Sequence, residues 1–395
     1  MSEVTTTGKE VNLGKHVAVF ALIGIVFTIL SIVWIVGEGT RGTALPGYLF
    51  AVMFFMSATL GGFALTLLQH VLNGKWGLPI LRIFEAAGGA RNFILMAALF
   101  IPIGVFAKEL YPWADSAKVA ADAVLQHREK YLNWGFVGIR FAAYFLFWAG
   151  MAYYMRRSVK VQEATGKYRE QQKRANYGSA SLVFIVLTVT FAYTDWVMAI
   201  DAHWWSSMYG LWFVAGMGLN AVSLAAVLSC LNATKAPYNQ IVNKSWTRDI
   251  GNLMFTFTML WGYTNLGQYL IIWHGNIPET ATYLVNRSLG HWSYMSFALV
   301  IGQFFIPFFA LLSPRVKATP KLLAMVGIWI LAMRVVDHFH VIEPFFRANL
   351  QVTWQDLVAF VGVGGLWAAV FSYNVKRVPL LPKYDARLLE VEHVH

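Results

Sequence analysis

The amino-acid sequence predicts an all-α, polytopic transmembrane helical bundle, and three observations support this class. Of the 395 residues, 57% are apolar and only 13% are charged, about half the charged share of soluble domains. Aromatic residues make up 16%, including 16 Trp, as expected of a chain that repeatedly crosses membrane interfaces. Apolar runs long enough to cross the hydrocarbon core recur along the whole chain. Together they argue against a soluble enzyme, a fibrous protein or a disordered chain.

Ten segments are apolar and long enough to be predicted as spans, within one integral membrane domain over residues 1–395. The first follows a polar N-terminal segment, 1–15, and is too long for a signal-peptide core. The third is the weakest, because it is short and contains Pro102. The ten are 16–37, 47–72, 91–107, 136–155, 180–200, 208–231, 250–273, 291–312, 321–341 and 355–375.

The distribution of Lys and Arg predicts the orientation of this bundle. With ten spans both termini share one face, which carries 22 of the 31 basic residues, against seven on the other face. The positive-inside rule then predicts that segment 1–15 and the tail 376–395 lie on the cytoplasmic side of a bacterial inner membrane. The net charge of +11 therefore indicates orientation and contact with membrane lipids, not nucleic acid.

The longest connection on the opposite, periplasmic face is the loop 108–135. It is charge-balanced and predicted to be an extramembrane helical excursion that could dock a partner. On the cytoplasmic half, His70 is interpreted as a span-end residue that reaches the interface. Cys230 is the single cysteine, which argues against a disulfide framework and against a Cys-ligated iron–sulfur cluster in this chain.

The richest set of ionisable residues at membrane depth is the hairpin 191–210 between the fifth and sixth spans. Ionisable side chains within the bilayer lower the stability of the fold, so a functional role is the first hypothesis for each of them. Asp195 lies inside the helix end, whereas Asp201 and His203 lie at the turn. For Asp201, a structural helix cap is an equally good interpretation. We expect Arg140 of the fourth span to pair with Asp195 of the adjacent fifth span.

A second cluster lies at the end of the ninth span, in the sequence RVVDHFHVIEPF over 334–345. Five ionisable side chains fall within ten positions there: Arg334, Asp337, His338, His340 and Glu343. Helical spacing puts Arg334 on one face with Asp337 and His338, which predicts a ladder of titratable groups. The alternative is a structural Arg–Asp pair with interfacial histidines.

A third group lies on the seventh and eighth spans. His274 and His291 flank this connection beside Trp273 and Trp292, either as part of a quinone cavity or as aromatics at headgroup level. The amide of Gln268 on the seventh span is more typical of polar contacts that join helices.

The chemistry of these residues favours two classes of function, quinol oxidation and proton-coupled secondary transport, over haem or zinc binding. No two histidines lie at matched mid-membrane depth, which argues against haem in this chain, and the His338/His340 spacing does not fit zinc. Quinol oxidation needs a proton acceptor and an apolar, aromatic pocket for the ring. Proton-coupled secondary transport uses a buried carboxylate but usually shows broken helices and an inverted repeat, and neither is clear in the sequence.

The sequence also resembles a known family. The stretch TDWVMAIDAHWWSSMYG (194–210), the run from Tyr238 to the NIPET motif at 276–280, and HVIEPFF (340–346) resemble NrfD/PsrC-like membrane subunits. The nearest likeness is to the ActF-type subunit of alternative complex III, the bacterial quinol:cytochrome c oxidoreductase. The resemblance is most specific over 180–346 and departs from the family at NIPET, where one of two acidic residues is replaced.

This resemblance implies ten helices, arranged as two four-helix bundles and two extra helices. It implies respiratory or photosynthetic electron transfer from menaquinol or ubiquinol, with a sister NrfD-like subunit, a periplasmic iron–sulfur subunit and multihaem c-type cytochrome subunits as partners. Haem and iron–sulfur clusters would lie in those other chains. In such complexes the better-supported quinol site belongs to the sister subunit, so a proton path in this chain remains an alternative to a quinol cavity.

Position by position, two acidic stretches match the family. Asp195, Asp201 and His203 match its acidic hairpin, and Asp337, His338, His340 and Glu343 match the end of its ninth helix. We expect Asp195 and Asp337 to carry protons, the histidines to relay them to the periplasm, and Arg334 to keep Asp337 ionised. A lone proton-coupled transporter and a structural scaffold subunit are the alternatives.

Overall fold

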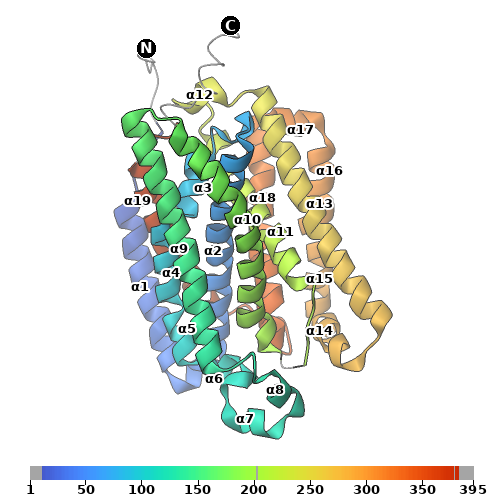
Figure 1. The fold of residues 1–395 in the computed structure, drawn as a ribbon. Coiled ribbons are helices and arrows are strands. Elements are labelled where there is room, and N and C mark those ends of the chain that lie inside the picture. Colours follow the sequence, from blue (N-terminus) through green and yellow to red (C-terminus); the bar gives the residue numbers. More distant parts are fainter. Residues whose placement is uncertain (1–10, 202, 378, 382–395) are drawn as a thin grey trace.

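A computed structural model describes residues 11–201, 203–377 and 379–381, and these residues form helices joined by turns, without a β-strand (Figure 1). The predicted all-α class is confirmed for this part of the chain. The terminal segments predicted as cytoplasmic, 1–15 and 376–395, lie largely outside the described residues.

Within the described ranges, nine helical stretches are long and apolar enough to cross a membrane. They are α1 (Val17–Val36), α2 (Glu38–Leu72), the broken stretch α3 to α5 (Leu81–Val105), α9 (Trp134–Thr165), α10 with the 3₁₀ turn η3 (Arg169–Ile200), α11 (Tyr209–Leu231), α15 to α16 (Trp292–Leu312), α18 with the turn η5 (Pro320–Phe345) and α19 (Trp354–Lys376). The seventh predicted span forms the helix α13 (Lys244–Gly275) but falls outside these nine. Polar residues such as Asn265 and Gln268 lower its hydropathy.

Contacts between helices close two rings of four helices, and the two buried helices α2 and α11 belong to one ring each. In one ring α2, α4 (Ala90–Leu99), α9 and α10 pack in turn; in the other, α11, α13, α16 (Ile306–Leu312) and α18 do so. The rings meet where α11 packs on α2 and α10. Both central helices are largely buried, so their apolar side chains form the core of the molecule.

Helices α1 and α19 pack tightly against each other beside the first ring. A Cβ on Gly24 would lie 2.3 Å from the backbone nitrogen of Leu366, so only glycine permits this approach. Gly362 lies against Thr28, and Gly14 lies against Lys376, which shows that the two helices are antiparallel. We call the end where α1 begins and α19 ends the terminal end, and the opposite end the distal end (Figure 1).

The third predicted span is not one continuous helix. The predicted range 91–107 is divided between α4 and α5 (Ile101–Val105) and ends where α6 (Ala107–Leu110) begins, and the short helix α3 (Leu81–Ala87) precedes it. Pro102 lacks the N–H that would bond back along the helix, so a break is expected here. The predicted loop 108–135 continues at the distal end as the short helices η2 (Pro112–Ala114), α7 (Ser116–Ala121) and α8 (Ala123–Arg128), as seen in Figure 1.

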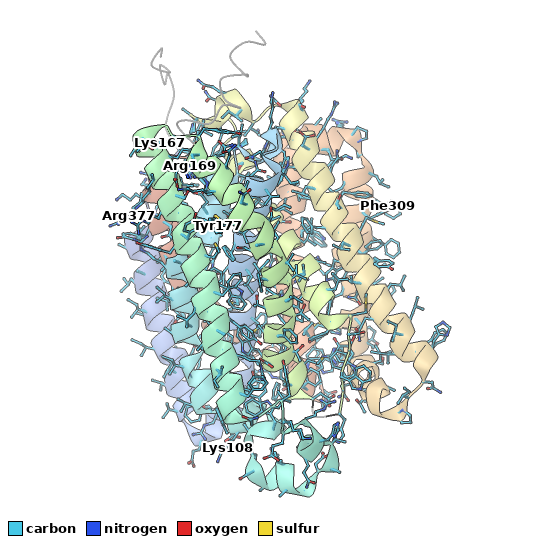
Figure 2. The ribbon with its side chains drawn as sticks, viewed as in Figure 1. Lys108, Lys167, Arg169, Tyr177, Phe309 and Arg377 are labelled. Atoms are coloured by element: carbon cyan, nitrogen blue, oxygen red, sulfur yellow. The ribbon has the colours of Figure 1, made fainter. Side chains whose placement is uncertain are left out.

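The remaining short helices connect the longer ones. At the terminal end these are η1 (Lys75–Gly77), α12 (Tyr238–Ile241) and α17 (Pro314–Ala318), and at the distal end α14 (Pro278–Ser288). Helix α15 (Trp292–Leu299) continues through a π-helical turn, η4 (Val300–Phe305), into α16. Exposed basic residues such as Lys167 and Arg169 lie near the terminal end, whereas Lys108 lies near the distal end (Figure 2).

Candidate functional site

An apolar cavity of about 270 Å³ lies near the distal end between the broken third span and the helices α9 and α10. Its wall is mostly aromatic and aliphatic, with one carboxylate. The lining residues are Ala97, Phe100, Ile101, Ile103, Gly104, Ala107, Tyr111, Trp113, Trp134, Val137, Gly138, Phe141, Asp195 and Trp196. We call this the aromatic cavity. It exists because the break at Pro102 and the turn at Phe106 interrupt the third span beside α9.

Asp195 is the carboxylate of the aromatic cavity, and it is only 2% exposed. Arg140 of α9 binds it with two hydrogen bonds, from Nε to Oδ2 at 2.9 Å and from Nη2 to Oδ1 at 2.8 Å. The Tyr144 hydroxyl donates a third, to Oδ2 at 3.1 Å. The predicted pairing of Arg140 with Asp195 is therefore confirmed.

Arg140 is itself held by the connection that precedes α9. Its guanidinium stacks 3.8 Å from the centre of the Tyr131 ring and donates to the Tyr131 carbonyl oxygen at 2.9 Å. The ring of Phe136 lies 4.3 Å away. These contacts fix the guanidinium in one place, so the position of the Asp195 carboxylate is fixed with it.

Two further polar groups belong to the cavity wall. Tyr111 donates its hydroxyl to the Trp196 carbonyl oxygen at 2.8 Å. Burial, and then the charge of Asp195, raise the pKa of Tyr111 above its ordinary value, so the phenol stays a neutral donor. The indole Nε1 of Trp113 is buried and makes no hydrogen bond within the described part of the chain. A buried donor without a partner is costly, so this indole is available to a ligand.

Sequence reasoning identified Asp195 and Arg140 and expected an aromatic cavity near this face, but it did not place that cavity beside the third span. Trp113 and Trp134 were recognisable as aromatics near span ends, and Pro102 marked the third span as weak. These are the signals that could have located it, since broken helices at membrane depth occur where they line a cavity.

Asp201 and His203, the other two hairpin residues, line a wider, more polar cavity of about 750 Å³ at the distal end, which we call the distal cavity. Asp201 accepts hydrogen bonds from the backbone nitrogens of His203 at 2.9 Å and Trp204 at 3.2 Å. Its side chain therefore holds the turn and does not cap α11, whose N-cap is Met208, so the helix-cap alternative is wrong in its position. His203 Nε2 lies 3.0 Å from Oδ2 of Asp122, which also lines this cavity. The contact joins the hairpin to the excursion α7–α8.

Asp122 also caps α8. Its Oδ1 accepts hydrogen bonds from the backbone nitrogens of Val124 at 2.8 Å and Leu125 at 3.4 Å. These backbone bonds, with a smaller contribution from His203, lower the pKa of Asp122 below 3.8. The side chain is therefore an anion at neutral pH.

The second cluster is centred on a buried ion pair in the second ring. Arg334 donates to Oδ2 of Asp337, and the indole of Trp261 on α13 donates to the same oxygen at 3.3 Å. Gly216 of α11 makes room, since a Cβ there would lie 2.4 Å from the Arg334 guanidinium. Oδ1 of Asp337 has no hydrogen-bond partner within the described residues. The structural Arg–Asp pair named as the alternative is thus present.

The remaining members of this cluster point to different neighbours, so they do not form one continuous ladder. His338 is buried, and its Nδ1 lies 2.8 Å from the Arg334 carbonyl oxygen while its ring packs on Phe54. His340 Nε2 lies 2.8 Å from the Ser296 hydroxyl. Glu343 is fully buried, 2.9 Å from Nε of Arg347. Spacing along one helix did not reveal that adjacent helices approach it from several sides.

His274 and His291, expected at a quinone cavity or at the interface, are both exposed. His274 lies against Trp273 with ring centres 5.1 Å apart, and His291 lies 6.1 Å from Tyr294. Neither lines the aromatic cavity or the distal cavity. Their placement fits the interfacial interpretation. Gln268 accepts a hydrogen bond from Ser206, as expected of an amide that joins elements.

A charged network at the terminal end of the first ring was missed. Glu85 of α3 accepts hydrogen bonds from Arg82 at 2.6 Å and Arg156 at 3.0 Å, and Nε2 of His70 lies 3.7 Å from its other oxygen. Arg82 also binds Glu163 of α9. His70 is therefore buried against Glu85 and does not reach the interface, because α3 folds back over the end of α2.

In the described ranges, no three His, Cys, Asp or Glu side chains gather closely enough to hold a metal ion. The apolar, aromatic lining of the aromatic cavity suits an organic ligand. No known protein-family model matches the chain, and no curated protein is similar enough to count as a relative.

Proposed function

We propose that this protein is a quinol-binding membrane subunit of a quinol:cytochrome c oxidoreductase of the alternative complex III type. The observation that carries the proposal is the aromatic cavity, where a single buried carboxylate faces an otherwise apolar wall. A quinol ring needs such an apolar, aromatic pocket with a few polar groups at its edge. The resemblance to NrfD-like subunits and the packing of helices in two rings of four support the same assignment.

The chemistry assigns Asp195 the role of proton acceptor. Oxidation of a quinol releases two protons and two electrons and leaves the quinone. As a carboxylate within the cavity, Asp195 can accept a proton from the ring hydroxyl, and the free indole N–H of Trp113 can donate to a quinone oxygen. The second proton would follow through the same carboxylate once the first has left it, and the two electrons would pass to the haem and iron–sulfur groups that the proposal assigns to partner subunits.

Proton release completes the proposed role. The distal cavity, with Asp201, His203 and Asp122, provides polar groups on the way to solvent. Asp337, His338, His340 and Glu343 are further titratable side chains at the same end. Because they contact different neighbours and not one another, a proton path through the second ring would need water molecules between them. With the terminal end in the bacterial cytoplasm, both sets would release protons to the periplasm.

Partner subunits would dock around this end. The excursion α7–α8 is exposed beyond the helical bundle (Figure 1) and fits the periplasmic iron–sulfur or multihaem subunits. The sister NrfD-like subunit would contact the bundle within the membrane. The cofactor of this chain is then the quinone alone.

A second candidate function follows from the broken third span. Interrupted helices beside a buried carboxylate are also typical of proton-coupled transporters. Purification in mild detergent separates the two candidates. A complex subunit is expected to co-purify with haem absorbance, whereas a transporter acting alone is expected to be colourless.

The Asp195→Asn variant tests the proposed chemistry directly. Asparagine keeps the shape but cannot accept the proton, so quinol-dependent cytochrome c reduction should fall by about a hundredfold or more. The measurement is steady-state turnover of the purified complex, normalised to its haem content so that assembly is counted separately.

Glu85→Gln is the matched control. Glu85 also carries a buried, arginine-paired carboxylate, bound by Arg82 at 2.6 Å, but it lies at the terminal end and lines neither the aromatic cavity nor the distal cavity. The control should turn over like wild type for each assembled complex. Wild-type turnover of the Asp195→Asn complex would refute the role of Asp195.

A further inference from the structure

We propose that the aromatic cavity opens sideways into the bilayer between α5 and α9, and that its ligand is a quinone with a hydrocarbon tail that leaves through this opening. The inference rests on the proposed function and adds the route of entry and the ligand class. The opening, which we call the lateral portal, is bordered by Ile101 and Gly104 on the third span and by Trp134 and Gly138 on α9.

The cavity runs from exposed residues to buried ones. All four portal residues are exposed, with Ile101 at 63% and Trp134 at 52%. At the other extreme, Asp195 and Trp196 of α10 are buried. One cavity therefore connects the outer surface of the helical bundle with the proton acceptor.

The portal faces the hydrocarbon region. Gly104 and Gly138 lie within stretches long and apolar enough to span the membrane. Exposed apolar side chains such as Ile101 are stable there because the surrounding solvent is lipid. A ligand that enters by this route must itself be soluble in the bilayer.

Two glycines keep the portal open. A Cβ added to Gly104 or to Gly138 would meet no atom within 4 Å, so packing does not require glycine at either position. Farther along, α4 packs directly on α9 and closes the gap, but α5 follows the break at Pro102. Side chains larger than hydrogen on these two residues would project into open space at the portal.

The size of the cavity determines which part of the ligand it holds. A cavity of about 150 Å³ accommodates benzene, so about 270 Å³ is enough for a substituted quinone ring. It falls below the roughly 300–1,000 Å³ of pockets that enclose whole drug-sized ligands. The ring therefore fits beside Asp195 and Trp113, while a prenyl tail must extend through the portal.

The test compares Gly138→Leu with Gly150→Leu. Both glycines are exposed on α9, and a Cβ meets no atom within 4 Å at either, but Gly150 does not line the cavity. Binding of menaquinone and of menadione, which has the same ring system without the tail, is measured in the purified complex in nanodiscs as competition against a photoreactive quinone whose cross-links to this chain are counted by mass spectrometry, so that a site on the sister subunit does not contribute.

We expect Gly138→Leu to weaken menaquinone binding by about tenfold or more, since losing the burial of roughly two methylene groups produces that factor. Menadione binding should stay within about twofold, and Gly150→Leu should match wild type with both ligands. Unchanged menaquinone binding by Gly138→Leu would overturn the portal. Equal loss of both ligands would also overturn it, because the leucine would then be filling the ring pocket. Failure of wild type to bind either ligand would instead refute the proposed function.

Discussion

Asp195 is bound by donors that all come from one neighbouring helix. Arg140 and Tyr144 lie one turn apart on α9, and both reach the carboxylate on α10. A buried carboxylate with three such donors is well compensated, and losing one partner leaves an unpaired charge in a medium of low polarity. The pair joins α9 to α10 in the first ring and fixes the carboxylate that lines the aromatic cavity.

Replacing Arg140 with leucine should lower the free energy of unfolding by about 3–5 kcal/mol, because Asp195 would remain buried without its counter-charge. The double variant Arg140→Leu/Asp195→Leu should recover a large part of that loss, since neither charge remains. Chemical unfolding in detergent, arranged as a double-mutant cycle, measures the coupling. Additive losses in the cycle would contradict a direct interaction.

At the scale of single residues, the sequence predicted which side chains form an ion pair better than it predicted where a side chain points. Arg140 and Asp195 were matched from the depth of each residue in adjacent spans. The side chain of His338 could not be placed in this way, because its surroundings depend on how α2 and α11 pack against α18. Glu85 was missed, and His70 was wrongly placed at the interface, for the same reason, since only the fold brings α3 back onto α2.

Among the elements, the excursion α7–α8 contacts the hairpin after α10 through Arg128, which donates to the Trp204 carbonyl oxygen at 3.5 Å, and through Asp122, whose side chain has two functions. Asp122 caps α8 through backbone nitrogens and contacts His203 across the distal cavity. The cap belongs to α8 itself, whereas the contact with His203 fixes α8 relative to the rest of the molecule.

Two substitutions at Asp122 separate these functions. Asparagine also caps helices well, so Asp122→Asn should lose only the ionic contact with His203, whereas Asp122→Ala should lose the cap too. Hydrogen exchange of residues 123–128 should therefore increase strongly for alanine and only weakly for asparagine. Equal exchange in both variants would show that the cap is unimportant.

The cap that Asp122 forms on α8 has a defined dependence on pH. The pKa of Asp122 is lower in the folded protein than its ordinary 3.8, so its ionised form stabilises the fold above pH 3.8. That contribution is lost as the pH falls through the lowered pKa. Exchange in residues 123–128, corrected for the intrinsic rate, should rise in that acid range for wild type but not for Asp122→Asn.

The third span shows how far an element can be predicted. Its short apolar run and Pro102 made it the weakest of the predicted spans, and its helix is interrupted beside Pro102. The consequence of that weakness, a cavity against α9, depended on which helix lies beside the break. The seventh span was predicted from length, and its polar composition separates α13 from the nine stretches that meet both criteria.

For the molecule as a whole, the charge distribution predicts an orientation in the membrane, and this orientation can be measured. Lys167 and Lys108 are exposed near opposite ends of the bundle (Figure 2). Cys230, the single cysteine, is buried in α11, so the wild-type chain should give a low background in thiol labelling. A cysteine introduced at either lysine then reports which end faces outward.

In intact cells, Lys108→Cys should react with a membrane-impermeant maleimide, and Lys167→Cys should react only after the membrane is permeabilised. The reason is that the terminal end, with the larger number of basic residues, is expected to stay in the cytoplasm. The opposite labelling pattern would reverse the orientation and place the aromatic cavity on the cytoplasmic half.

The glycine contact between α1 and α19 has a consequence for biogenesis. During synthesis α1 leaves the ribosome long before α19, yet the close approach of Gly24 requires the backbone of α19. Until then, this surface of α1 faces lipid or a membrane chaperone. A nascent chain that stops before α19 would leave its earliest helix without its closest neighbour, and quality-control proteases that sample loosely held segments should find it there first.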